Sequence, residues 1–166
     1  PLRLQKGMNA SSGVTGLLFA IPTLAYAISA PVIGFLSQRI GHSKAMTMGM
    51  ILAAVCFPFI ALSNSVGLVA IALVFLGVGM GTAITPCLPE FAEISQKSGI
   101  NSFGASFSIY NTAYSIGMMI GPTLGGILTN YLGIVRSYSV VAIVIFVYMI
   151  FFNLYNHYAL KTVEQF

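Results

Sequence analysis

The sequence predicts an all-α integral membrane protein whose chain crosses the bilayer five times. Only 6% of its 166 residues are charged and 57% are hydrophobic, whereas a soluble domain averages about 25% charged residues. The ten charges leave uncharged runs of 32, 45, 38 and 24 residues between them. A helix needs about 20 such residues to cross the hydrocarbon core, where a charge is costly. These runs do not alternate as the strands of a membrane β-barrel would.

The polar residues that bound each run predict where the first three spans begin and end. The first span stops before Gln38-Arg39, and it contains two prolines, which packed membrane helices tolerate. The second begins at Lys44, and Ser63-Asn64-Ser65 separates it from the third. The third ends near Pro89-Glu90. The predicted spans are about 11–37, 44–62 and 66–88.

The remaining two spans follow a polar segment. Glu90–Ser102 carries charged and amide side chains, which predict a loop that can include a short surface helix. The fourth span, about 103–129, follows it and ends before Asn130. The fifth span, about 137–158, begins after Arg136. The chain is therefore predicted to be a multi-pass membrane protein embedded in a lipid bilayer, either in a vesicle or in the plasma membrane.

Two helix ends resemble each other. Gly34–Gly41 and Gly126–Gly133 share the pattern Gly, apolar, Leu, Ser/Thr, amide, any residue, Ile/Leu, Gly, at an offset of 92 residues (126 − 34). That offset holds three spans and predicts two three-helix repeats, as in many transporters. Residues 1–166 would then be part of a six-helix half whose first helix precedes Pro1. The alternative is a coincidental likeness of glycine-rich helix ends.

Glycines are concentrated on two of the predicted spans. The fourth contains the string Gly117-x-x-x-Gly121-Pro122-x-x-Gly125-Gly126, and the third contains Gly77-x-Gly79-x-Gly81. Small residues four apart let helix backbones approach closely, and a proline bends a helix. The fourth-span string is thus predicted to be a structural or gating motif, with plain helix packing as the alternative.

The turn after the first span brings basic and acidic residues to one membrane surface. Gly34 and Gly41 allow a tight turn between helices, and Arg39 lies between them. Glu90, at the end of the third span, falls on the same side of the predicted topology. We expect an interaction between Arg39 and Glu90 that stabilises one conformation.

The turn is similar to the loop motif G-x-L-x-D-R-x-G-R-K of the major facilitator superfamily. Gln38 replaces its Asp and His42 its first basic residue after the glycine. The glycine-proline string resembles the antiporter motif of that superfamily. Within it, the chain most resembles the vesicular amine transporter family, near the polyamine branch. The matching strings are Ser29-Ala30-Pro31 with Gly34, Pro86-Cys87-Leu88-Pro89-Glu90, and Tyr114–Gly126.

This resemblance covers nearly the whole chain and implies helices eight to twelve of a twelve-helix transporter. It implies proton-coupled antiport of an organic cation, such as an amine or polyamine, by alternating access. The monoamine and acetylcholine branches place acidic residues in helices ten and eleven, where this chain has Ile84 and Asn111.

No carboxylate lies within any predicted span, so neutral side chains are the candidates for the substrate pathway. Tyrosine rings can hold a cation by cation–π contact, and hydroxyl or amide groups inside the membrane need partners. For each candidate, an interhelical hydrogen bond is the alternative role. The candidates are Tyr26, Ser29, Thr85, Asn111 and Tyr114.

The residues give little support for an enzyme, a metalloprotein or a nucleic-acid-binding protein. The spans offer no buried nucleophile or paired acid for an enzyme, no ligand set for a metal, and no motif for a cofactor. The seven basic residues are spread over every loop, which does not suit nucleic-acid binding. Expected partners are the lipid bilayer, the missing N-terminal half of the same chain, a small organic solute and protons. The alternatives are a major facilitator transporter of another organic solute or drug, or a non-transporting membrane scaffold.

Overall fold

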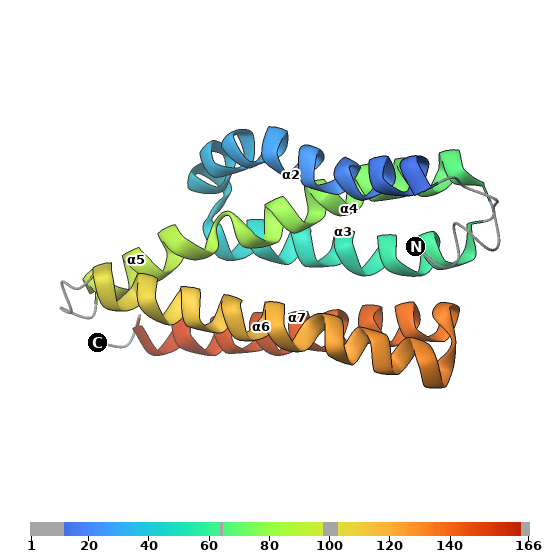
Figure 1. The fold of residues 1–166 in the computed structure, drawn as a ribbon. Helices are drawn as coiled ribbons and strands as arrows, with labels where there is room; N and C mark the ends of the chain where they lie inside the picture. Colours follow the sequence, from blue (N-terminus) through green and yellow to red (C-terminus); the bar gives the residue numbers. More distant parts are fainter. Residues whose placement is uncertain (1–11, 64, 98–102, 164–166) are drawn as a thin grey trace.

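The computed structural model describes residues 12–63, 65–97 and 103–163, and within them every regular element is an α-helix. The all-α prediction is therefore confirmed for the part of the chain that the structure describes. Figure 1 shows the arrangement of the six helices. They are α2 (Ser12–Ile40), α3 (His42–Leu62), α4 (Val66–Ile84), α5 (Cys87–Lys97), α6 (Phe103–Leu132) and α7 (Ile134–Val163).

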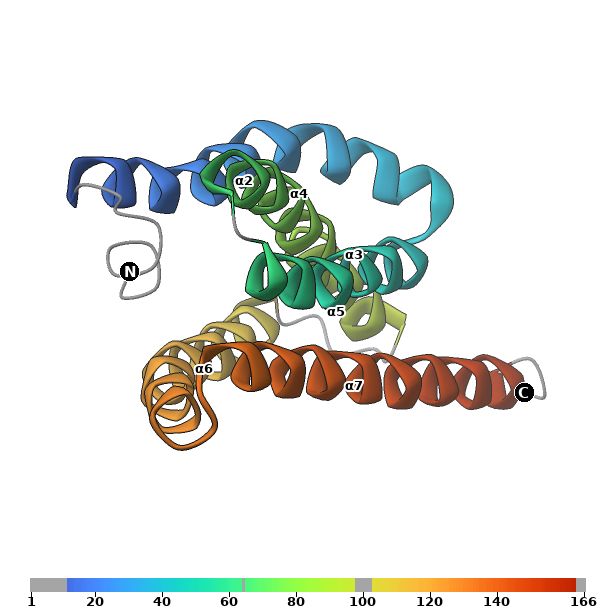
Figure 2. The same cartoon turned by 90° about the vertical axis from the view of Figure 1, so that its right-hand side faces the viewer.

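Helix α3 lies at the centre of the bundle. It packs against α4 and α7 over much of its length and also contacts α2 and α5 (Figures 1 and 2). The buried apolar cluster is formed between α3 and α4, and Tyr138 of α7 packs on its edge. Helices α6 and α7 form a hairpin on the other side of α3, where α6 contacts α5 and α7. The cluster consists of Ala53, Cys56, Ile60, Val69, Ala72 and Leu76.

Glycines permit the closest helix contacts. A Cβ atom added at Gly49 of α3 would meet the Gly79 carbonyl oxygen of α4 at 2.7 Å, and one at Gly79 would meet the Ala53 nitrogen at 3.1 Å. On the opposite side of α4, a Cβ at Gly77 would lie 2.9 Å from the Cβ of Ala25 in α2. The glycine face predicted on this segment is thus a packing surface, because no side chain fits between the backbones.

Two turns have the same geometry at the offset seen in the sequence. Gly41 (φ 93°) separates α2 from α3, and Gly133 (φ 76°), 92 residues later (133 − 41), separates α6 from α7. Both glycines donate their N–H to the carbonyl four residues earlier, Ser37 and Thr129 respectively. L-residues rarely adopt such positive φ values, so glycine is required at both turns.

Four helical stretches in the described residues are long and apolar enough to cross a bilayer. They are Gly16–Ile40, His42–Leu62, Val66–Gln96 and Ile134–Asn156. Helix α6, which covers the predicted fourth span, has 30 residues and would be about 45 Å long. Its length suffices, but it is less apolar than these four stretches. Its first half carries the polar residues Ser106, Ser108, Asn111, Thr112 and Ser115.

The helix boundaries differ from the expected ones mainly near the third span. Helix α4 ends at Ile84, a turn follows at Thr85-Pro86, and α5 continues to Lys97. Pro86 and Pro89 have no N–H to donate and so interrupt the helix. The predicted loop Glu90–Ser102 is therefore helical as far as Lys97. Ser11, the predicted start of the first span, and the end of that loop lie outside the described residues.

Large apolar side chains cover the outside of the helices. Leu17, Ile28 and Phe151 each expose two thirds or more of their surface, as do Leu62 of α3 and Met119 of α6. A water-soluble domain rarely exposes so much contiguous apolar surface. The hydrocarbon of a bilayer solvates such a surface, in agreement with the membrane fold.

Substituting Gly49 tests the α3–α4 contact. We expect Gly49→Ala to destabilise the full-length protein by about 1–3 kcal/mol, because the added methyl overlaps the backbone of α4. Gly67→Ala on α4 is the matched control, since its nearest neighbour, the Ser65 Oγ, would be at 3.8 Å. Thermal unfolding in detergent micelles measures both. Equal melting temperatures for the two variants would show that the helices do not pack as described.

Candidate functional site

Three of the predicted pathway residues lie along the contact between α2 and α4. A Cβ added at Gly81 of α4 would lie 3.0 Å from Ser29 Oγ and 3.2 Å from Tyr26 Cδ2, both on α2. One turn farther on, Thr85 Cγ2 would lie 3.8 Å from a Cβ at Gly34. The absence of side chains at Gly81 and Gly34 thus lets Tyr26, Ser29 and Thr85 approach the facing helix.

The hydroxyl groups of these residues differ in their bonding. Ser29 Oγ donates to the Tyr26 carbonyl at 3.1 Å, within its own helix. Thr85 Oγ1 is buried and has no hydrogen-bond partner among the described residues. A buried hydroxyl without a partner costs free energy, and such groups commonly occur at functional sites. Thr85 is therefore the pathway residue with the most unused bonding capacity.

The other two predicted pathway residues lie on α6. Asn111 is exposed and donates from Nδ2 to the Phe107 carbonyl at 3.0 Å, which leaves its Oδ1 available. Tyr114 is 47% exposed. Its ring stacks on that of Tyr110, with 6.1 Å between centroids and 17° between planes.

Tyr110 is a residue that sequence reasoning missed, although its spacing of four residues from Tyr114 was a signal for a shared helix face. Tyr110 and Tyr114 thus form a stacked pair of rings on α6. Helix α6 otherwise contacts α5 and α7.

The glycine-proline string of α6 is uncovered in the described residues. A Cβ atom added at any of its four glycines would meet no atom within 4 Å. The helix continues through Pro122 without interruption. The predicted close packing therefore has no partner among the described helices. The string comprises Gly117, Gly121, Pro122, Gly125 and Gly126.

The expected pair between Arg39 and Glu90 is not formed in the described structure. The Arg39 guanidinium carbon lies 4.7 Å from the centroid of the Phe35 ring, in the same helix. Glu90 Oε1 accepts a hydrogen bond from Ser43 Oγ at 2.8 Å. Arg39 lies at the exposed end of α2, and its side chain lies along its own helix. The residues that contact α5 are His42 and Ser43, which follow the turn.

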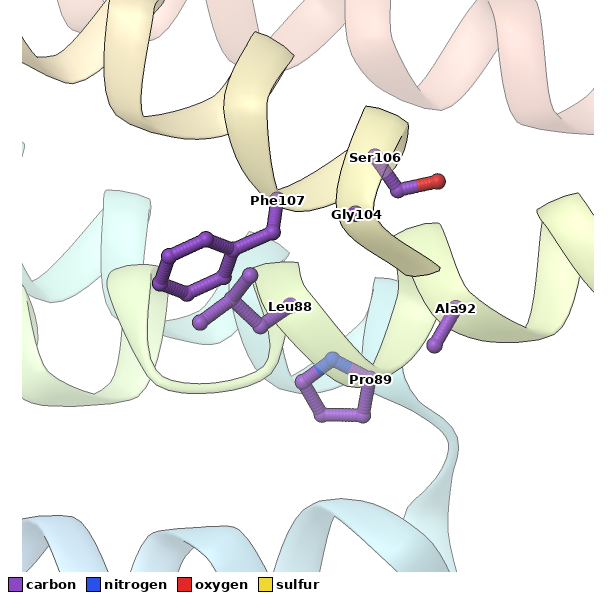
Figure 3. Close-up of a pocket in the computed structure, with 6 residues that line it drawn as sticks. All are labelled: Leu88, Pro89, Ala92, Gly104, Ser106 and Phe107. Atoms are coloured by element: carbon purple, nitrogen blue, oxygen red, sulfur yellow. The ribbon is translucent and has the colours of Figure 1, made fainter. Parts of the chain in front are cut away.

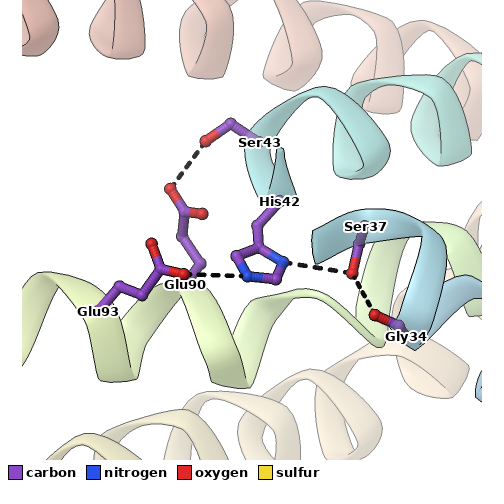
Figure 4. A network of polar contacts seen from close by, with 6 residues as sticks. All are labelled: Gly34, Ser37, His42, Ser43, Glu90 and Glu93. Carbon is purple, nitrogen blue, oxygen red and sulfur yellow. Dashed lines mark hydrogen bonds and ion pairs between the residues drawn. The ribbon is translucent and has the colours of Figure 1, made fainter. Parts of the chain in front are cut away.

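A polar network joins the α2–α3 turn to α5 instead (Figure 4). The His42 ring is only 7% exposed, and its Nε2 lies 3.2 Å from Glu93 Oε1. Its Nδ1 lies 3.2 Å from Ser37 Oγ, which donates to the Gly34 carbonyl at 3.0 Å. His42 is the first residue of α3. Its position directly after Gly41, and the spacing of Glu90 and Glu93 by one helical turn, were the available signals.

Two cavities lie beside α5. The polar one, about 520 Å³, is lined by residues of the network and by α7. The other, about 530 Å³, is mostly apolar and lies between α5 and the start of α6, where Phe107 lies beside Leu88 (Figure 3). Among the described residues no group of three or more His, Cys, Asp or Glu could hold a metal ion.

Comparison with known proteins gives a consistent family assignment. The family model for the Major Facilitator Superfamily matches residues 1–163. The "MFS-type transporter SLC18B1" of Rattus norvegicus is 29% identical over 80% of this chain and 32% of its own length. The "Synaptic vesicular amine transporter" of Homo sapiens is 24% identical over 87% of this chain and 28% of its own length. The chain thus spans about a third of these relatives. No solved structure matches significantly.

Replacing Thr85 tests whether its hydroxyl lacks a partner. We expect Thr85→Val to leave the stability of the full-length protein unchanged or to raise it by about 1 kcal/mol, because valine has the same shape without the unpaired hydroxyl. Thr82→Val is the control, since Thr82 Oγ1 donates to the Val78 carbonyl at 2.7 Å. Thermal unfolding compares them. If Thr85→Val lowered the stability as much as Thr82→Val, the Thr85 hydroxyl would be hydrogen-bonded, which would contradict the description.

Proposed function

The chain belongs to the major facilitator superfamily, and we propose that the whole protein exchanges protons for an organic cation, such as an amine or polyamine, by alternating access. The chain is part of a multi-pass integral membrane protein of a transporter family, which is not a family of enzymes. The observation that carries the proposal of an amine substrate is the similarity to a relative whose name states that it transports amines.

The tyrosines of α2 and α6 support a cationic solute. Tyr110 and Tyr114 present stacked rings on α6, and Tyr26 contributes a further ring from α2. Tyrosine rings attract organic cations through their negative faces, and the attraction is stronger where water is excluded. We assign Thr85 Oγ1 and Asn111 Oδ1 as hydrogen-bond acceptors for the ammonium protons of the solute.

The proton-coupling carboxylate is assigned to the N-terminal half. The three acidic residues of this chain are Glu90, Glu93 and Glu164, and none falls within a predicted span. A cation inside the membrane needs a negative partner, because burying an unpaired charge is costly. The relatives match this chain over about a third of their own length, which leaves ample sequence for such an acid.

Residues 1–166 are proposed to be helices eight to twelve of twelve, within a half made of two three-helix repeats. The recurrence of the turn geometry at Gly41 and Gly133 supports the repeat. The uncovered glycines of α6 support a missing partner, because helices pack closely on such faces. The turn residues Gly34, Arg39 and Gly41, together with Glu90, keep a proposed role in gating, through a pairing of Arg39 and Glu90 that forms in another conformation.

Uptake by reconstituted protein tests this function. The full-length protein is placed in liposomes with an imposed pH gradient and offered radiolabelled monoamines, acetylcholine and polyamines. We expect uptake of at least one cation that collapses when an ionophore dissipates the gradient. Uptake of a neutral solute alone would support another transporter specificity, and no uptake of any solute would support a scaffold. Either result would overturn the proposal.

Removing the Tyr114 ring tests the solute contact. We expect Tyr114→Leu to lower the apparent affinity for the cation by roughly 3- to 30-fold, in line with a cation–π contribution of about 0.5–2 kcal/mol. Tyr114→Phe keeps the ring and should stay near wild type. Tyr131→Leu, at an 82% exposed position on the same helix, is the control for loss of a tyrosine. Concentration-dependent uptake gives the affinities, and equal effects at Tyr114 and Tyr131 would contradict the assignment.

A further inference from the structure

The hydrogen bonds around His42 are all made at once only when the ring carries two protons. Ser37 has one hydroxyl proton, and Ser37 Oγ donates it to the Gly34 carbonyl at 3.0 Å. Its oxygen is then an acceptor for His42 Nδ1, 3.2 Å away. Glu93 Oε1, 3.2 Å from Nε2, is a carboxylate oxygen and also accepts. Both ring nitrogens therefore face acceptors, which is the bonding pattern of the imidazolium ion.

A neutral ring loses one of these bonds. If Nδ1 is unprotonated, Ser37 must turn its proton toward the ring and release the Gly34 carbonyl. If Nε2 is unprotonated, its lone pair faces the carboxylate of Glu93, and the two repel each other. Ser37 is fully buried and His42 is 7% exposed, whereas Glu93 is 54% exposed, so the partner on the Ser37 side is the harder one for water to replace.

We propose that His42 is a proton-binding site that fastens the α2–α3 turn to α5. The site follows from the donors and acceptors around the ring, and it does not depend on which solute the protein carries. A histidine in this position is suited to the task, because the ordinary pKa of histidine, about 6.5, lies within the physiological range.

The groups that face His42 include charges of both signs. Helix α5 contributes two carboxylates, Glu90 and Glu93, to the cavity beside the ring, and α3 contributes one ammonium group, Lys44. The cavity residues on α2 and α7 carry no charge. The α2 guanidinium, Arg39, lies over Phe35, and α4 has no charged residue. The thiol of Cys87, at the start of α5, contacts Met46 and the Ala83 carbonyl. The uncharged residues are Ser37, Gln38, Asn153 and Asn156.

Proton binding and the α3–α5 contact must stabilise each other. The bonds from His42 to Ser37 and Glu93 coexist with the bond from Ser37 to the Gly34 carbonyl only when both ring nitrogens carry a proton, so protonation of the ring and this full set of bonds favour each other. Helix α5 continues α4 across the turn at Thr85-Pro86, and α3 begins at His42. A proton at this end of the bundle therefore biases the position of α5, and through it the end of α4 that carries Thr85.

Nitrogen NMR of the histidine side chains tests this site without a transport assay. The full-length protein is labelled with ¹⁵N-histidine in lipid nanodiscs, and the His42 signals are identified by their loss in His42→Gln. We expect both ring nitrogens to carry a proton at about pH 6. At about pH 7, Glu93→Gln should lower the ratio of protonated to neutral ring about 3- to 10-fold, because the glutamine amide can donate to Nε2 of a neutral ring.

Two further variants make the test specific. Ser37→Ala removes the acceptor of Nδ1 and should also lower the protonated fraction, which provides a second measurement if Glu93→Gln fails to fold. Glu90→Gln is the matched control, since Glu90 accepts from Ser43 and not from the ring, and its effect should be smaller. A neutral His42 at about pH 6, or equal responses to Glu90→Gln and Glu93→Gln, would overturn the site. Because transport is not measured, such a failure leaves the proposed antiport intact.

Discussion

The close approach of α3 and α4 through Gly49 and Gly79 is the contact on which the rest of the structure depends. Lipid tails are as apolar as leucine, so membrane helices gain little from burying apolar side chains against each other. They associate where small residues let backbones meet and dispersion contacts accumulate. With α3 fixed on α4, the remaining face of α3 packs against α7, and its first residues lie at α5.

The turns at Gly41 and Gly133 have similar geometry, but the helices before them, α2 and α6, pack differently. At the first, α2 lies on α4, where the side chains of Tyr26 and Ser29 lie against Gly81. At the second, α6 carries an equally glycine-rich face that meets nothing in the described residues. The polar side chains in the first half of α6 fit a surface that faces another part of the protein or a solute. The difference in packing thus separates a structural helix pair from a helix with a free face.

The helices could be predicted from the sequence because a single constraint, the exclusion of charge from hydrocarbon, acts on every residue of a span. The turns at Gly41 and Gly133 were also predictable, since only glycine tolerates their φ values. The partners of Glu90 were not. Arg39 and Ser43 are both near the turn in sequence, and only the direction of α3 after Gly41 decides which one reaches α5.

The sequence predicts part of the candidate site, because polar residues such as Tyr26, Ser29 and Thr85 are rare within spans. Their approach to the facing helix depends on Gly34 and Gly81, which leave room for these side chains. Tyr110 was overlooked because a tyrosine at helical spacing has no distinct signal until its ring is seen stacked on Tyr114. Periodicity predicts which face a residue is on, and the crossing of helices determines what it meets.

We propose that α2, α4 and α6 together bound the path of an organic cation. The most direct test is a cryo-EM map of the full-length protein in nanodiscs with a saturating amine that it transports. We expect solute density in contact with Tyr26, Thr85 and Tyr114. Solute density enclosed by other helices, with these three residues packed against protein or lipid, would contradict it.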